Sequence, residues 1–362
     1  MHEALQLAAL AVGLCEPNPR VGCVIVAPDG RIIGRGHTQQ AGGPHAEVMA
    51  LHDAAANGES VQGATVHVTL EPCSHHGRTP PCSDALIAAK VGGVVIAVED
   101  PNPLVAGSGA ERLRRAGIAV STGPCADESR ELNIGFFSRM QRGRPWVRLK
   151  VAVSLDGRTA LPDGSSQWIT GIEARTDGHA FRKRAGAILT GVGTVLDDDP
   201  RLDVRLVPIA NQPLRVVVDS RLDLPLDARI LQPPGRVLVY AAAPSDDRRR
   251  ALEKLGVEVA LRPSANGKVD LGAMLEDLAV ARGINELHVE AGHKLNGSWV
   301  REGLVDEFLV YMAPKLIGVG RELALFGPLS GLDSAPALAF TRIDAIGADL
   351  RILARPVPPP SK

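Results

Sequence analysis

A histidine, a glutamate and two cysteines stand at spacings that suit a metal-activated water molecule. They occur in the segments Pro44-His45-Ala46-Glu47, Glu71-Pro72-Cys73 and Pro81-Cys82. Catalytic zinc takes three protein ligands and leaves a fourth position to water, whose pKa then falls towards neutrality. His45, Cys73 and Cys82 form such a ligand set, and the Glu47 carboxylate can move protons between water and substrate. The motif predicts one zinc ion per chain, with Glu47 as the proton carrier.

The predicted ligands lie at helix starts. His45 and Glu47 are two residues apart, so they would point in different directions in mid-helix and can converge only at a helix N-terminus. Pro44 suits a first-turn position, and Pro81 precedes Cys82 in the same way. The positive end of a helix favours thiolate over thiol. His-x-Glu followed by Pro-Cys and a second Cys is typical of zinc deaminases, although their short form places the cysteines closer together.

Composition narrows the class of partner. The chain has 362 residues, enough for two domains, and a formal net charge of -1. Nucleic-acid binding needs a basic excess and aromatic side chains for stacking, whereas this chain has six Phe, three Trp and two Tyr. A small-molecule substrate is therefore expected, with no nucleic-acid partner. The first residues show no signal peptide, and no apolar run reaches membrane-spanning length.

The five cysteines are an odd number in a long chain, which argues against a secreted disulfide framework and predicts a cytoplasmic protein. Outside the proposed zinc ligands, Cys15, Cys23 and Cys125 are expected to be small buried hydrophobic residues.

Alternating apolar runs predict two α/β domains. In the first, residues 1–144, we expect strands over 21–27, 31–37, 65–70, 94–98 and 118–120 and helices over 1–13, 82–90, 111–115 and 127–140. In the second, residues 145–355, we expect strands over 147–153, 187–190, 214–218, 237–240, 287–289, 308–312 and 350–353, with helices over 173–184, 246–255 and 271–281. The proline-rich tail, residues 356–362, is expected to be disordered.

The second domain lacks a Gly-x-Gly-x-x-Gly turn, so a Rossmann dinucleotide site is not predicted. One segment suits a phosphate: Gly292-His293-Lys294-Leu295-Asn296-Gly297-Ser298, ahead of a helix expected to begin at Trp299. A glycine-bearing loop that opens a helix offers free N–H groups and a positive dipole end. A plain strand-to-helix turn would explain this segment about as well.

Several longer motifs resemble the bifunctional deaminase/reductase family of riboflavin biosynthesis. The motifs that carry the likeness are Asn18-Pro19-Arg20-Val21-Gly22, the segment from Glu71 to Cys82, Asp100-Pro101-Asn102-Pro103, Ser154-Leu155-Asp156-Gly157-Arg158, Gln167-Trp168-Ile169-Thr170, Thr194–Pro200, Val289-Glu290-Ala291-Gly292 and Ala313–Gly318. The resemblance covers nearly the whole chain and includes the long spacing between the cysteines. It implies a cytidine-deaminase-like N-terminal domain, a three-layer α/β/α fold, and a dihydrofolate-reductase-like C-terminal α/β domain.

For the first domain, the resemblance implies hydrolytic deamination of 2,5-diamino-6-ribosylamino-4(3H)-pyrimidinone 5′-phosphate. The loop between the cysteines adds His75 and Arg78, which we expect to bind the ribose phosphate, because Arg presents a fixed, always-charged fork. Asn18 has both a donor and an acceptor with which to read the pyrimidine edge. His37 is a second candidate there, and His76 is expected to lie in solvent.

For the second domain, the resemblance implies NADPH-dependent reduction of the ribosyl chain of 5-amino-6-(5-phosphoribosylamino)uracil to ribityl. It carries cofactor contacts onto Ala152, Trp168, Thr194, Asp198, Ser220 and Gly292, His293, Lys294, Leu295, Asn296, Gly297 and Ser298, and substrate contacts onto Ser166, Arg182, Leu202, Arg205 and Glu290. Arg182 and Arg205 are suited to clamp a phosphate, and Asp198 is expected near the transferred hydride. His293 and Lys294 depart from the family pattern, and their charge suits the 2′-phosphate of the cofactor.

Three alternatives stay open at this point. The chain could be a monofunctional zinc deaminase of a nucleotide or of tRNA with a non-catalytic C-terminal domain. It could hold a structural zinc ion, although structural sites use four protein ligands and no convincing fourth is evident. The reductase half could also be inactive. In the bifunctional interpretation, we expect a homo-oligomer.

Overall fold

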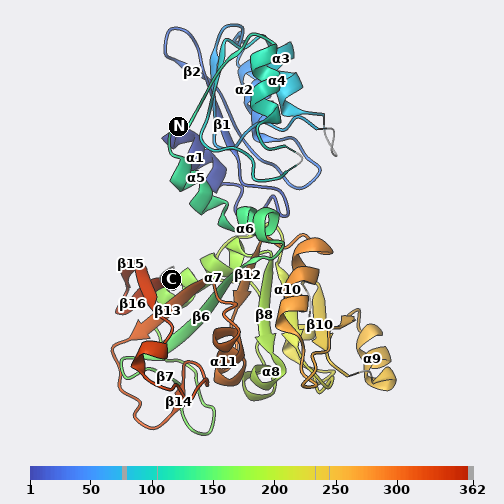
Figure 1. Ribbon diagram of the computed structural model, residues 1–362, viewed down its shortest axis with the longest axis vertical. Helices are drawn as coiled ribbons and strands as arrows, with labels where there is room; N and C mark the ends of the chain where they lie inside the picture. The colour runs from blue at the N-terminus through green and yellow to red at the C-terminus, as the bar shows by residue number, and fades with distance from the viewer. Residues whose placement is uncertain (76–79, 104, 233, 244, 358–362) are drawn as a thin grey trace. The chain divides into compact units, whose positions relative to one another are not determined.

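The computed structural model describes residues 1–75, 80–103, 105–232, 234–243 and 245–357. The chain divides into two compact units, Met1–Arg144 and Pro145–Lys362, coloured blue to green and green to red in Figure 1. Each unit has its own sheet and its own apolar core. Among the described residues, no helix is both long enough and apolar enough to cross a membrane. Of the predicted tail, Pro356 ends a strand and residues 358–362 lie outside the described residues.

Unit 1 is built on a five-stranded sheet with the strand order β2-β1-β3-β4-β5. β1 is antiparallel to β2 and to β3, whereas β3, β4 and β5 run parallel. The strands are β1 (Gly22–Val26), β2 (Ile32–His37), β3 (Thr65–Val68), β4 (Gly93–Ile96) and β5 (Ala119–Thr122), and the helices are α1 (His2–Ala9), α2 (Ala46–Ala56), α3 (Cys82–Ala88), α4 (Ser108–Arg115), α5 (Ala126–Leu132) and α6 (Ile134–Arg142).

Glycines on β1 and β2 show that helices cover both faces of this sheet. A Cβ on Gly22 would lie 1.8 Å from the carbonyl oxygen of Ala4 in α1, and a Cβ on Gly36 would lie 2.2 Å from that of Ala46 in α2. Gly36 pairs with Cys23, the neighbour of Gly22, and adjacent strand residues face opposite sides. α1 and α2 therefore lie on opposite faces, which confirms the predicted three-layer α/β/α fold (Figure 1).

The single helix predicted over 127–140 is wrong, because the chain breaks it into α5 and α6 at Asn133. The Asn133 side chain is buried and bonds the backbone of Arg20 in both directions, at 2.8 Å from Arg20 N and 2.9 Å to Arg20 O. An amide that satisfies both backbone groups of another residue substitutes for a strand partner. The break thus anchors the Asn18-Pro19-Arg20 segment beside the sheet.

Unit 2 contains a nine-stranded sheet with the order β11-β10-β9-β8-β12-β6-β13-β16-β15, parallel from β11 to β13 and antiparallel at its last two strands. The strands are β6 (Trp146–Ser154), β8 (Ala187–Gly191), β9 (Leu214–Val218), β10 (Val237–Ala241), β11 (Glu258–Leu261), β12 (Glu286–Val289), β13 (Glu307–Ala313), β15 (Leu338–Ile346) and β16 (Asp349–Pro356). A small ribbon pairs β7 (Arg158–Ala160) with β14 (Arg321–Glu322). The helices are α7 (Ile172–Arg184), α8 (Val192–Asp198), α9 (Asp246–Glu253), α10 (Leu271–Val280) and α11 (His293–Arg301), with single 3-10 turns at Arg229–Leu231 and Leu332–Ser334.

Three sequence predictions for the remaining elements need correction. Helix α11 begins at His293, not Trp299, because Leu295, Trp299 and Val300 pack together into the core of unit 2. Helix α2 begins at Ala46, so Pro44 lies outside it and His45 is its N-cap. Cys125 is half-buried at the N-cap of α5, whereas Cys15 and Cys23 are buried as expected. The elements that the sequence did not predict are α8, β7, β11, β14 and β15.

Candidate active sites

Three side chains of unit 1 converge on one point. His45 caps α2, Cys73 lies in the segment that follows β3, and Cys82 is the first residue of α3. Their ligand atoms all lie within 4.8 Å of one another. His45 Nδ1 is 3.3 Å from Cys82 Sγ and 3.7 Å from Cys73 Sγ. Tetrahedral zinc would set nitrogen and sulfur ligands about 3.5 Å apart, so this donor set fits zinc.

The two cysteines differ in how readily they lose a proton, and Cys73 is the one whose pKa is lowered. The backbone N–H of Cys82, at the start of α3, donates to Cys73 Sγ at 3.3 Å. A hydrogen bond from the Cys82 thiol, together with His45, lowers the pKa of Cys73 to about 4 in spite of its partial burial. The pKa of Cys82 is raised by the same shared proton and by burial. One thiolate thus stands ready without metal, and binding of zinc releases the second proton.

Glu47 lies in the first turn of α2, one residue beyond Ala46, and is 3% exposed. Burial, helped by the charge of Cys73 and opposed by His45, raises the pKa of its carboxyl to about 7. It is not one of the three clustered ligands. A buried carboxyl of this kind beside a metal site can accept and return a proton near neutral pH.

A second buried glutamate shapes the loop beside Cys73. Glu71 is 3% exposed and accepts backbone N–H bonds from Asp100 at 3.2 Å, Gly107 at 2.9 Å and Ala110 at 3.0 Å. These bonds fix the backbone of Asp100, Gly107 and Ala110 near the segment that delivers Cys73. Burial raises the pKa of Asp100 to about 6, with a further contribution from Glu71. Neither carboxyl was among the predicted site residues.

The other residues predicted for this domain differ in their burial. Asn18 is half-buried, and its carbonyl oxygen accepts from Cys15 Sγ at 3.2 Å. His37 is half-buried at the end of β2, where burial lowers its pKa. His75 is exposed. His76 and Arg78 lie outside the described residues.

Removal of zinc is expected to abolish deamination and to expose a reactive thiolate. Treatment with a chelator should stop ammonia release, and zinc should restore it. Because the pKa of Cys73 lies far below that of an ordinary thiol, iodoacetamide should label Cys73 only after metal loss. Half-buried Cys125 serves as an internal control, because its labelling should not depend on zinc. Ammonia release at an undiminished rate from metal-free protein would contradict the zinc assignment.

In unit 2, the predicted residues gather at the carboxyl edge of the parallel strands. β8 leads through Gly191 into α8, which carries Thr194 and Asp198, and β12 leads into Glu290 and Gly292. A Cβ on Gly292 would lie 3.4 Å from Thr194 Oγ1, and one on Gly191 would lie 3.1 Å from Leu295 Cδ2. The starts of α8 and α11 therefore adjoin (Figure 1). Ligands of open α/β sheets bind at this edge.

The segment from Gly292 to Ser298 is the N-cap and first turns of α11 rather than a loop. Asn296 and Gly297 are buried: Asn296 Nδ2 donates to Leu323 O at 2.9 Å, and a Cβ on Gly297 would lie 1.8 Å from Leu325 O. These two residues hold the helix against the 323–325 segment. His293 is half-buried and Lys294 is exposed. First-turn amides lack partners within the helix, so a phosphate fits at Gly292.

Glu290 is the centre of a charge cluster whose side chains are partly buried. Its carboxylate accepts from Arg182 Nε at 2.5 Å and Nη2 at 2.9 Å, and lies 3.5 Å from Lys150 Nζ and 3.2 Å from His288 Nε2. Burial would raise the pKa of Glu290, but Arg182 and Lys150 hold it well below its usual range. Arg182 also donates to the carbonyl oxygen of Asp203 at 2.8 Å. Arg182 is thus committed largely to Glu290.

Arg205 is the more accessible of the two predicted clamp residues. Its side chain is 44% exposed and contacts Asp203 Oδ1 at 2.6 Å. Elsewhere, Ser166 Oγ donates to Asp198 at 3.2 Å, and burial raises the pKa of Asp198. Trp168 is 56% exposed beneath the guanidinium of Arg175.

The remaining predicted residues of unit 2 lie in a strand, in the apolar core and in a backbone hydrogen-bonded segment. Ala152 lies on β6, Leu202 is buried in the core, and the carbonyl oxygen of Ser220 accepts from Ala242 and Ala243.

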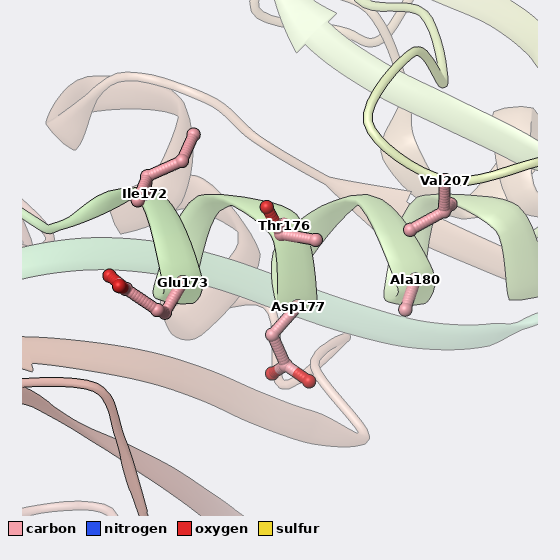
Figure 2. A pocket seen from close by; sticks show the side chains of 6 residues that line it. All are labelled: Ile172, Glu173, Thr176, Asp177, Ala180 and Val207. Carbon is pink, nitrogen blue, oxygen red and sulfur yellow. The ribbon is translucent and has the colours of Figure 1, made fainter.

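An open groove of about 480 Å³ lies along the face of α7 that carries Ile172, Thr176 and Ala180. Figure 2 shows Ile172, Thr176 and Ala180 along the helix, with Val207 near its end. The charged groups that line the groove are Glu173 and Asp177, and Asp177 already accepts from Tyr311 and Arg351. A groove lined by carboxylates does not suit a phosphorylated substrate.

Comparison with known proteins agrees with the function predicted for each of the two domains. Residues 1–98 match the cytidine and deoxycytidylate deaminase zinc-binding region, and residues 145–352 match the RibD C-terminal domain. Riboflavin biosynthesis protein RibD of Escherichia coli K12 is 47% identical over 97% of this chain and 96% of its own length. The RibD of Aquifex aeolicus is 41% identical over 97% of this chain and 96% of that protein. The chain belongs to the RibD family.

Solved structures of RibD family members share the fold over nearly the whole chain. Acinetobacter baumannii RibD superposes with a TM-score of 0.88 at 41% identity, covering 98% of this chain and 97% of that one. A Thermotoga maritima deaminase/reductase gives a TM-score of 0.87 at 35% identity, covering 99% and 97%. Like its RibD relatives, the chain is a bifunctional deaminase and reductase of riboflavin biosynthesis. The monofunctional alternative is not favoured, and the two predicted fold families are confirmed.

Sequence reasoning did not identify Lys150, His179 and Asp203 as part of the reductase region. Lys150 had a detectable signal, since Arg148 and Lys150 alternate as charged residues in the otherwise apolar strand β6. His179 and Asp203 had none, because each owes its position to a contact between α7 and a distant loop.

Proposed function

We propose that the deaminase domain acts on 2,5-diamino-6-ribosylamino-4(3H)-pyrimidinone 5′-phosphate and the reductase domain on 5-amino-6-(5-phosphoribosylamino)uracil with NADPH. The observation that carries the first half is the convergence of His45, Cys73 and Cys82 beside buried Glu47. The Thermotoga maritima relative is described as a diaminohydroxyphosphoribosylaminopyrimidine deaminase/5-amino-6-(5-phosphoribosylamino)uracil reductase. The similarity over 99% of this chain supports the same substrates here.

In the deaminase site, His45 Nδ1 and the two cysteine sulfurs would hold one zinc ion. Zinc supplies the acidification of the attacking water. The Glu47 carboxylate takes the proton of that water and delivers it to the exocyclic amino group, so that neutral ammonia leaves. Asn18 is proposed to read the pyrimidine edge, and His75 with Arg78 to bind the ribose phosphate.

In the reductase site, NADPH supplies the hydride. We propose that the first-turn amides of α11, with Gly292 and Thr194 beside them, receive a phosphate of the cofactor, and that exposed Lys294 faces its 2′-phosphate. Arg205 is proposed to bind the substrate phosphate, with Arg182 and Glu290 as the buried floor of that site. Asp198, held by Ser166, is the proposed acid near the transferred hydride.

A single assay separates the two halves of this proposal. The pyrimidine phosphate is incubated with the zinc-loaded protein and NADPH, and ammonia release and NADPH oxidation are followed separately. Both signals are expected, with oxidation lagging behind ammonia. Ammonia release without NADPH oxidation would overturn the reductase half. The absence of both ammonia release and NADPH oxidation would overturn the substrate assignment. The free state of all five cysteines also fits the proposed cytoplasmic location.

We further propose that the protein is a homo-oligomer that pairs through β15. This edge strand exposes Leu338 (43%), Phe340 (69%) and Ile343 (55%), which lie on the same sheet face as exposed Leu350 of β16. Antiparallel pairing of two copies about Ile343 would set Arg342 of each chain opposite Asp344 of the other. The strand is therefore self-complementary in charge as well as apolar.

The pairing predicts that Ile343→Asp lowers the molar mass measured by light scattering to that of a smaller assembly. The control Leu255→Asp places the same charge on another exposed apolar residue, 51% exposed, and should leave the mass unchanged. A wild-type monomer at micromolar concentration would overturn the proposal.

A further inference from the structure

The proposed phosphate-binding residue Arg205 is part of a tightly held loop, residues 201–205. Leu202 and Val204 point into the core and are 2% and 3% exposed. The Gln212 amide bonds both backbone groups of Val204, at 2.8 Å from Val204 N and 2.7 Å to Val204 O. Asp203 between them is also buried, at 4% exposed, whereas the Arg205 side chain is 44% exposed. The path of the main chain therefore decides where the Arg205 side chain leaves the loop.

One side chain of helix α7 fastens this loop at Arg205 itself. The backbone N–H of Arg205 donates to His179 Nδ1 at 3.1 Å. One helical turn further, Arg182 Nη1 donates to the carbonyl oxygen of Asp203 at 2.8 Å. Val207, two residues beyond this loop, lies near Ala180 in Figure 2. His179 and Arg182 thus hold two positions of the loop from one face of α7.

The bond from Arg205 also fixes the chemical state of the His179 ring. A backbone N–H can only donate, so Nδ1 must be unprotonated and the ring proton lies on Nε2. Nε2 stands 3.4 Å from Arg182 Nη1. The ring is 5% exposed, and burial together with Arg182 and Arg205 lowers its pKa to about 4, although Glu290 and Asp203 act in the opposite sense. His179 is a neutral acceptor at physiological pH.

We propose that His179 is a positioning residue that aims the Arg205 guanidinium at the substrate phosphate by holding the Arg205 main chain. The proposal rests on the assignment of Arg205 as the phosphate-binding residue. Asp203 completes the arrangement: it is 4% exposed, and its carboxylate bonds Arg205 Nη1 at 2.6 Å and Arg201 Nε at 3.1 Å. Arg201 and Arg205 are two cations against the single carboxylate of Asp203, and the remaining positive charge suits a phosphate dianion.

Two polar replacements distinguish positioning from packing. In His179→Asn the amide can place an acceptor near the position of Nδ1, whereas in His179→Gln the amide group reaches the position of Nε2. Reductase kinetics are measured with the deaminated ribosylamino-pyrimidine as its 5′-phosphate and as the dephosphorylated nucleoside. We expect His179→Gln and His179→Ala to raise KM for the phosphorylated substrate about tenfold with little change in kcat. His179→Asn should stay within about threefold of the wild type.

The dephosphorylated nucleoside and Arg205→Ala complete the test. A positioning role leaves the rate with the nucleoside unchanged in all three His179 variants, whereas a purely structural role slows both substrates equally and would overturn the proposal. Arg205→Ala should reduce the preference for the phosphorylated substrate about a hundredfold. If it does not, the phosphate assignment fails, and the inference fails with it. If it does and His179→Gln behaves as wild type, the inference alone is wrong.

Discussion

Glu47→Gln is expected to reduce ammonia release by about 10²–10⁴-fold while NADPH oxidation with pre-deaminated substrate stays at the wild-type rate. The carboxylate accepts the proton of the attacking water, and the amide cannot. Glutamine has nearly the same shape as glutamate and no charge. It therefore fits a position that is 3% exposed and at which burial raises the pKa of the native carboxyl. The measurement is ammonia release under saturating pyrimidine phosphate.

Zinc content separates this chemical effect from loss of the metal. Glu47 is not among the three clustered ligands, so Glu47→Gln should retain one zinc ion per chain by elemental analysis. Cys82→Ser is the matched comparison, because it removes a ligand and should lose both zinc and activity. Full activity of Glu47→Gln at wild-type zinc content would show that another group carries the proton.

Glu290→Gln is expected to reduce reductase kcat/KM by at least about a hundredfold and to destabilise unit 2 by about 3 kcal/mol. The substitution leaves Arg182, whose side chain is 12% exposed, without its bidentate carboxylate and Lys150 without its counter-charge. Trp146, Trp168 and Trp299 all lie in unit 2 and are the three tryptophans of the chain. Urea unfolding followed by tryptophan fluorescence therefore reports on this unit.

The same variant should change how stability depends on pH. Because the pKa of Glu290 in the folded protein lies below its ordinary value of 4.5, its contribution is fully present above that pH. It is lost as the pH falls through the folded-state pKa. Unfolding of unit 2 in Glu290→Gln should therefore be less sensitive to acid than in the wild type. Glu276→Gln, an exposed residue of α10, is the control, and equal losses in both variants would contradict the role of the buried cluster.

The sequence by itself determined the parts whose chemistry is local. His45-x-Glu47 predicted a helix start because only there can residues two apart converge, and His45 is indeed the N-cap of α2. The fold class followed from hydrophobic periodicity, which depends on burial of one face of each helix or strand. The long motifs from Asn18 to Gly318 pointed to the family to which the chain belongs.

Only the tertiary structure decided the features that depend on residues far apart in the chain. Helical periodicity runs through Asn133, and the break there arises because its amide bonds the backbone of Arg20. A turn before Trp299 was plausible locally, but burial of Leu295 and Trp299 extends α11 back to His293. The sequence predicted Arg182 as a phosphate clamp, but the fold places the carboxylate of Glu290, 108 residues away, against its guanidinium. Contacts between residues far apart in the chain leave no periodic signal in the sequence. The role of His179 could therefore be inferred only from the structure, in which α7 contacts the loop of residues 201–205.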